Sequence, residues 1–145
     1  MRTIAWHYTV DDRAASILAE GRIRITSTLI DPSERGAAWL TTRLSYEPTA
    51  GKGGLDVEGM IAAGFTLYRF GVVDAGLVTW AEHRRSGGIT VHSADALERV
   101  AIADGSDPSE WRISYSPIPL ARVVHVDRHD GERWIDATPR ARRAA

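Results

Sequence analysis

The sequence contains no cysteine, which excludes a disulfide scaffold and any zinc site built on thiolates. It also lacks an apolar run long enough to span a membrane, and its N-terminal residues lack the apolar core of a signal peptide. The formal net charge is only -1, so no global basic field exists to recruit nucleic acid or a membrane surface. We therefore expect a soluble cytoplasmic protein with no membrane partner.

Familiar catalytic and cofactor motifs are absent as well. The chain has no phosphate-binding loop, no glycine-rich dinucleotide fingerprint, no His-Glu-x-x-His and no Gly-x-Ser-x-Gly. The histidines share no spacing that is typical of metal ligands; they are His7, His83, His92, His125 and His129. The sequence therefore predicts no metal site.

Length and composition fit one globular domain. The chain has 145 residues, of which 43% are hydrophobic and 26% charged, which is enough for a single buried core. Its end, TPRARRAA, offers little apolar surface to bury. We expect a domain over residues 1–137 and a flexible basic tail over residues 138–145.

Hydrophobic periodicity and turn signals predict strands mixed with helices. A strand over residues 3–9 leads into a helix, for which Thr9 and Asp12 resemble a capping box and Gly21 is a stop signal. Two prolines in SPIP forbid a continuous late strand, and the Asp-Gly at 130–131 is a hairpin signal. Further strands are predicted at 22–25, 37–42, 65–73, 111–115, 121–127 and 132–136, and helices at 75–85 and 93–103. This order predicts an α/β (α+β) fold, with a mostly antiparallel core flanked by helices.

Two segments place chemically useful side chains at the ends of predicted strands. AWHYTVDDRAASILAEGRI puts His7, Tyr8 and Thr9 between a strand and a helix, and AAWLTTRLSYEPTA carries paired threonines before a tyrosine and a glutamate. This arrangement, over residues 3–50, resembles the ADP-ribosyltransferase fold in its histidine-first branch. That branch includes the poly-ADP-ribose polymerases, enzymes of the diphtheria-toxin type and the RNA 2′-phosphotransferase.

The resemblance implies a split core that holds NAD between two sheets and breaks the bond from nicotinamide to ribose. His7 would hydrogen-bond the hydroxyls of the ribose on the adenosine side, and the backbone beside it, at Tyr8 and Thr9, would hold the nicotinamide carboxamide. Thr41 and Thr42 would correspond to the hydroxyl-bearing second motif.

The resemblance also assigns the leaving group and the acidic residue. Tyr46 would stack on the nicotinamide ring, as aromatic side chains do. The third motif of the family is a glutamate on a late strand that stabilises the cationic sugar. Here the matching position is Ser116, which carries no charge, so Glu47 and Glu110 are the candidate substitutes from adjacent loops.

Without the resemblance, the same residues have ordinary structural interpretations. Tyr8 alternates with His7 and so faces the other side of the strand, where core packing is expected. Thr9 would serve as a helix cap, and Thr41 and Thr42 as strand residues. The tryptophans are most simply core or half-core aromatics; they are Trp6, Trp39, Trp80, Trp111 and Trp134.

The function that we expect is an NAD-binding, mono-ADP-ribosyltransferase-like protein that transfers ADP-ribose to a macromolecular acceptor. A toxin or a phage or host conflict protein is a role consistent with it. The first alternative is a non-catalytic module that keeps a degenerate NAD pocket and binds a nucleotide or a nucleic-acid end. The second is a metal-independent nuclease or phosphotransferase with His7 as general base. The acceptor and the oligomeric state stay open.

Overall fold

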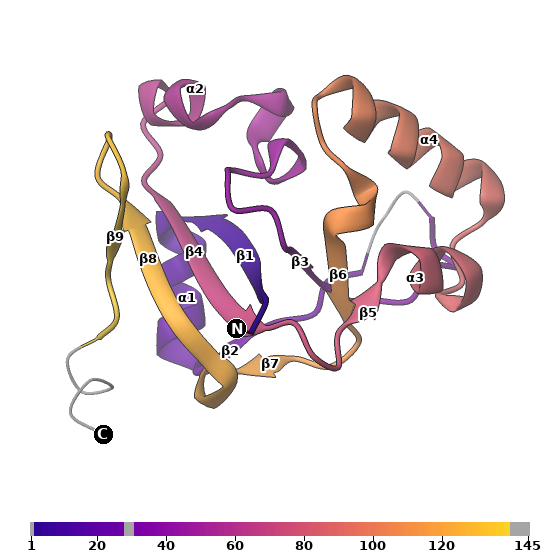
Figure 1. Cartoon of the computed structure of the whole chain (residues 1–145), viewed down its shortest axis with the longest axis horizontal. Helices are drawn as coiled ribbons and strands as arrows, with labels where there is room; N and C mark the ends of the chain where they lie inside the picture. Colours follow the sequence, from indigo (N-terminus) through magenta and orange to yellow (C-terminus); the bar gives the residue numbers. More distant parts are fainter. Residues whose placement is uncertain (1, 28–30, 140–145) are drawn as a thin grey trace.

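The described strands form one large sheet and one small one (Figure 1). The computed structural model describes residues 2–27 and 31–139. The strands of the large sheet are β1 (Ile4–Val10), β3 (Ala38–Thr41), β4 (Leu67–Val73), β5 (Val78–Thr79), β6 (Trp111–Ser114), β8 (Val123–His129) and β9 (Trp134–Asp136). Their order is β5-β6-β3-β1-β4-β8-β9, with every neighbouring pair antiparallel. The small sheet pairs β2 (Arg22–Ile23) with β7 (Ile118–Pro119).

The helices lie in separate groups around the large sheet. They are α1 (Asp11–Glu20), α2 (Val57–Ala62), α3 (Trp80–Ser86) and α4 (Val91–Ala103). In Figure 1, α1 lies behind β1 and β4, while α3 and α4 lie on the side of β5 and β6. Short 3₁₀ turns occur at Pro48–Ala50, Lys52–Gly54, Pro108–Glu110 and Leu120–Arg122. The chain is therefore a mixed α/β domain whose antiparallel sheet is flanked by helices, as its element order predicts.

The large sheet is weakly joined in its middle. β1 pairs with β4 along its whole length, from Ile4 opposite Val73 to Val10 opposite Leu67. In contrast, β1 and β3 share a single register pair, Trp6 opposite Thr41. No further register pair joins the two strands beyond this point. A gap in the ladder is therefore available for side chains from both strands.

β1 is buried on both faces, because its alternate side chains enter two different cores. Ala5 packs in a core with Phe70 and the α1 residue Ile17. Trp6 and Tyr8, with the opposite orientation, pack in a second core, which also includes Val10, Tyr46, Met60 and Leu67. A third core lies between β6 and helices α3 and α4; it includes Trp80, Ala94, Ala101, Trp111 and Ile113. This alternation puts His7 on the same face as Ala5.

Several local predictions are confirmed by the structure. α1 ends at Gly21, which adopts φ 79°, a left-handed conformation that glycine takes without strain. The Asp-Gly at 130–131 turns β8 into β9, and the Asp130 N–H donates to the Arg133 carbonyl. The SPIP segment breaks the late strands as expected, since only Ile118 and Pro119 pair there.

The predicted capping box at Thr9 is wrong. Thr9 stays in β1, opposite Tyr68, and the residue before the helix is Val10, which makes no side-chain capping bond. The reason is the ladder with β4, which extends the strand past the point where a helix would otherwise begin. The predicted helix 75–85 also starts later, at Trp80, because Val78 and Thr79 pair with β6. The short helix α2 was not predicted.

The predicted tail lies mostly outside the described residues. Thr138 and Pro139 are described, and residues 140–145 are not, so the tail of residues 138–145 stays a prediction. Over the described ranges, no helix is long and apolar enough to cross a membrane.

Candidate functional site

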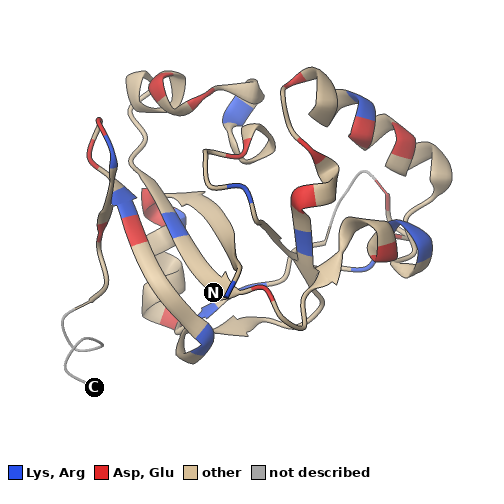
Figure 2. Cartoon of the chain, in the orientation of Figure 1, with Lys and Arg blue, Asp and Glu red and all other residues tan. Residues whose placement is uncertain are grey.

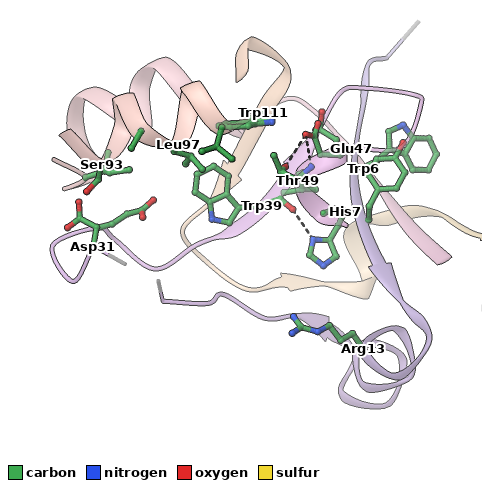
Figure 3. A pocket seen from close by; sticks show the side chains of 18 of the residues that line it. Trp6, His7, Arg13, Asp31, Trp39, Glu47, Thr49, Ser93, Leu97 and Trp111 are labelled. Atoms are coloured by element: carbon green, nitrogen blue, oxygen red, sulfur yellow. Dashed lines mark hydrogen bonds between the residues drawn. The ribbon is translucent and has the colours of Figure 1, made fainter. Parts of the chain in front are cut away.

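A cavity of about 860 Å³ opens where β1 and β3 separate. Its wall includes Trp6, His7 and Tyr8 of β1, and Trp39, Leu40 and Thr41 of β3. Further parts of the wall come from the loop of residues 31–34 and from one face of α4, as Figure 3 shows. Ligand pockets in proteins usually measure about 300–1,000 Å³, so this space is large enough for a small organic molecule.

His7 projects into this cavity in a defined orientation. Its Nδ1 lies 2.8 Å from the backbone oxygen of Trp39 across the gap between the strands. A carbonyl oxygen only accepts, so Nδ1 must carry the hydrogen and Nε2 of the neutral ring is an acceptor. Burial lowers the pKa of His7 below 6.5, the Trp39 hydrogen bond opposes this, and the charge of Arg13 lowers it further. His7 is therefore a neutral hydrogen-bond acceptor at neutral pH.

The lowered pKa of His7 makes a prediction for stability against pH. The unfolded chain takes up a proton at His7 near pH 6.5, whereas the native state does so only at lower pH. His7 therefore costs no stability above pH 6.5 and destabilises the native state as the pH falls below it. We expect His7→Gln to lose less unfolding free energy than the wild type between about pH 7 and about pH 5, as measured by urea denaturation. Equal losses in the two proteins would contradict this electrostatic description of His7.

Glu47 is a buried acid in the same wall. It follows β3 and is 5% exposed. Its Oε1 accepts hydrogen bonds from the Thr49 hydroxyl at 2.9 Å, from the Thr49 N–H at 3.4 Å and from the Ser106 hydroxyl. Its Oε2 is buried and has no hydrogen-bond partner among the described residues. One oxygen thus fixes the carboxylate, and the other retains its full capacity to accept hydrogen bonds.

Trp39 presents a partly open aromatic ring to the cavity. It is half-buried, whereas the other aromatic residues that line the described cavity wall, Trp6, Tyr8 and Trp111, are buried. The ring is held by edge-to-face contacts with Trp111 at 6.0 Å and with His83 at 5.3 Å. Such contacts fix a ring plane without covering both of its faces. The Trp39 ring thus lines the cavity in an orientation that neighbouring rings hold.

Two indole nitrogens in the wall also lack partners. Trp6 Nε1 and Trp111 Nε1 are buried and make no hydrogen bond within the described part of the chain. Most buried polar groups in native proteins are hydrogen-bonded, and an unpaired one costs about 1–3 kcal/mol. Together with Glu47 Oε2, these atoms are two donors and one acceptor that are buried without a partner in residues of the cavity wall.

The far end of the cavity is built by the loop of residues 31–34. Asp31 Oδ2 accepts from the Thr90 N–H at 3.0 Å and from the Thr90 hydroxyl at 3.1 Å, which joins the loop to the start of α4. Hydrogen bonds, that from the Ser33 hydroxyl first, hold the pKa of Asp31 well below its usual range. Figure 3 shows Asp31 and Ser93 on the opposite side of Trp39 from His7 and Glu47. The cavity therefore extends past the Trp39 ring.

A buried network supports this loop from behind. Glu34 Oε2 lies 2.7 Å from His83 Nε2, and His83 Nδ1 lies 2.8 Å from the Tyr115 hydroxyl. The His83 side chain is fully buried and contacts the Trp39 ring. The network thus connects Glu34 in the cavity wall to the Trp39 ring.

The structure brings together some of the residues that the sequence predicted for the site. His7, Tyr8, Thr41 and Glu47 all line the cavity. Tyr8 is also a core residue, as its alternation with His7 predicts, and its hydroxyl donates to the backbone oxygens of Arg43 and Leu44.

The other predicted site residues do not line the cavity. Thr9 is buried in β1, and Thr42 donates its N–H to the Glu110 carbonyl at 2.9 Å. Ser116 is exposed in the turn between β6 and β7. Tyr46, which we expected to stack on a ligand from a polar loop, is buried against Tyr8 with ring centroids 5.4 Å apart.

Sequence reasoning missed Trp39 as a site residue, because a strand tryptophan is usually a core residue. The available signal was the position of Trp39 in the sequence. It lies two residues before the pair Thr41 and Thr42, which were already candidates for the site. It also missed Arg13, which lines the cavity from α1.

Comparisons with family models, curated proteins and solved structures gave no match for this chain. Over residues 2–27 and 31–139, no three metal-ligating side chains gather into a group that could hold a metal ion.

Proposed function

We propose that the cavity binds NAD, and that the chain is a mono-ADP-ribosyltransferase-like enzyme that passes ADP-ribose to a macromolecular acceptor. One observation supports this most directly: His7 and Glu47 line a single cavity at the point where β1 and β3 separate. A neutral imidazole and a fixed carboxylate can each accept a hydrogen bond from a hydroxyl group of a ribose.

Each wall of the cavity supports a part of this proposal. His7 Nε2 accepts a hydrogen bond from a ribose hydroxyl, since its Nδ1 is already occupied by Trp39. The Trp39 ring takes over the stacking role that we expected of Tyr46, because it is half-buried and lines the cavity. Stacking holds the leaving nicotinamide in the orientation that bond cleavage needs.

Glu47 supplies the charge for the chemical step. As the bond between nicotinamide and ribose breaks, the electron pair leaves with the ring nitrogen and the sugar carbon becomes cationic. The Glu47 carboxylate stabilises this cation, which a neutral Ser116 cannot do. A nucleophile of the acceptor then bonds to the same carbon and releases its proton. Oε2 is the buried Glu47 oxygen that has no partner among the described residues.

NAD is expected to raise the melting temperature of the protein, and His7→Ala to remove most of that increase. A ligand that binds only the native state stabilises it by roughly 2.7 kcal/mol at a hundredfold excess over its Kd. Differential scanning fluorimetry with NAD, and with an analogue that lacks the labile bond, measures this shift. His129→Ala is the control, since His129 lies at the end of β8 and outside the cavity wall. If millimolar NAD leaves the wild type unchanged, the NAD part of the proposal fails.

A non-catalytic binding module is the second candidate. The described late strands contribute only Trp111 to the cavity, and no carboxylate from them lines it. Members of the family with an acidic third motif would place one there. Wild-type protein that binds NAD and releases no nicotinamide, with or without cell extract as a source of acceptor, would favour the module over the enzyme.

A further inference from the structure

The guanidinium of Arg13 is an unused positive charge at the cavity. Arg13 projects from α1, is exposed, and is the sole lysine or arginine among the described residues that line the wall. No ion pair or side-chain hydrogen bond of Arg13 exists within the described part of the chain. Other arginines differ in this respect, since carboxylates pair with Arg24, Arg69, Arg84 and Arg112.

The acids of the cavity wall are, in contrast, already engaged. Asp31 is bound by Ser33 and Thr90. Glu34 is bound by His83, and one oxygen of Glu47 is held by Thr49 and Ser106. An anionic ligand would therefore find its free electrostatic partner at Arg13.

Arg13 acts on the same part of the cavity as His7. Its charge is one of the causes that lower the pKa of His7, so the two side chains interact electrostatically. Figure 3 shows Arg13 reaching from its helix on the side of the cavity where His7 lies, away from Asp31 and Ser93. A ligand group bound by Arg13 therefore lies on the same side of the cavity as the one bound by His7.

We propose that Arg13 binds a phosphate group of the ligand, so that the cavity selects phosphate-bearing nucleotides over neutral nucleosides. A guanidinium presents paired N–H donors that match two phosphate oxygens, and charge-assisted bonds of this kind are stronger than neutral ones. This inference rests on the proposed function, in which His7 contacts a ribose of NAD. The phosphate that Arg13 binds is then the one attached to that ribose.

The test is a binding panel measured by titration calorimetry. The ligands are NAD, nicotinamide mononucleotide and ADP, which carry phosphate, and nicotinamide riboside, which does not. The proteins are the wild type, Arg13→Ala, Arg13→Lys and Arg22→Ala, where Arg22 is an exposed arginine of β2 outside the cavity wall. We expect Arg13→Ala to weaken the phosphate-bearing ligands about tenfold or more. Binding of the riboside is expected to be unchanged, with Arg13→Lys intermediate and Arg22→Ala like the wild type.

The pKa of His7, followed by NMR, gives a second readout that a purely structural role of Arg13 would not produce. Arg13→Ala should raise this pKa in the free protein, because a positive neighbour is removed. ADP should raise it in the wild type more than in Arg13→Ala, because its phosphate binds on the same side of the cavity as the ring.

The possible outcomes separate this inference from the proposed function. If Arg13→Ala binds the phosphate-bearing ligands as the wild type does, the inference is overturned and NAD binding stands on its own. If ADP binds with dependence on Arg13 but NAD does not bind, the phosphate site is supported and the proposed function fails. If none of the phosphate-bearing ligands binds the wild type, both proposals are overturned.

Discussion

Glu47→Gln is expected to reduce nicotinamide release from NAD about a hundredfold or more, while the affinity for NAD changes little. Groups that stabilise charge developing in a transition state contribute about 10²–10³ to the rate. An interaction made mainly in that state lowers turnover rather than binding. The rate is measured as nicotinamide released over time, and the affinity by calorimetry on the same samples.

This substitution removes the charge of Glu47 and should leave the local structure unchanged, because of the hydrogen bonds that hold the side chain. The amide oxygen of glutamine can keep the three bonds that Oε1 accepts from Thr49 and Ser106, so the turn after β3 should remain intact. Glu110→Gln is the matched control, since Glu110 was the other acidic candidate and does not line the cavity. A Glu47→Gln protein that releases nicotinamide at the wild-type rate would remove Glu47 from the chemistry. A loss of rate in Glu110→Gln alone would move the acidic role to that residue.

Tyr46→Ala is expected to cost about 3 kcal/mol or more of unfolding free energy, with or without NAD. Tyr46 is 8% exposed and packs in the core that contains Tyr8, Met60 and Leu67, so the truncation leaves a cavity there. Tyr46→Phe should cost little, because the Tyr46 hydroxyl makes no hydrogen bond with any described residue. Denaturation of the three proteins in urea measures the difference.

The ionisation of Tyr46 provides an independent check of its position. Burial, followed by the charge of Glu47 and by Tyr8, raises the pKa of Tyr46 to about 12. Absorbance titration of the wild type should show a tyrosine that ionises near this pH, and Tyr46→Phe should lack it. A Tyr46→Ala protein that stays stable but loses NAD binding would instead return Tyr46 to the ligand site.

The different positions of Trp39 and Tyr46 show where sequence reasoning about the site ends. Both are aromatic residues close to the same paired threonines, and the sequence favoured the tyrosine because it lies in a polar loop. In the structure that loop folds back, so that Tyr46 meets Tyr8 and Trp39 remains half-buried at the cavity. Burial of an aromatic residue depends on which distant segment covers it, and local composition does not contain that information.

Local signals in the sequence determined much of the order of elements. A glycine that adopts a left-handed conformation ended α1, an Asp-Gly turn formed the last hairpin, and two prolines interrupted the late strands. These are short-range effects, since each depends on the conformations available to a few consecutive residues. His7 and Glu47 became candidates through the resemblance to the ADP-ribosyltransferase fold, Glu47 as one of two substitutes for the missing glutamate of the third motif.

Only the tertiary structure decided that these residues share a cavity. β1 and β3 part after one register pair, and the loop at Asp31 is joined to Thr90, which is 59 residues away in the sequence. The ladder with β4 likewise keeps Thr9 in a strand and denies it the role of a helix cap. Such contacts are set by the free energy of packing and pairing the whole chain, which local propensity does not report. The site therefore exists through the fold, although two of its main side chains are visible in the sequence.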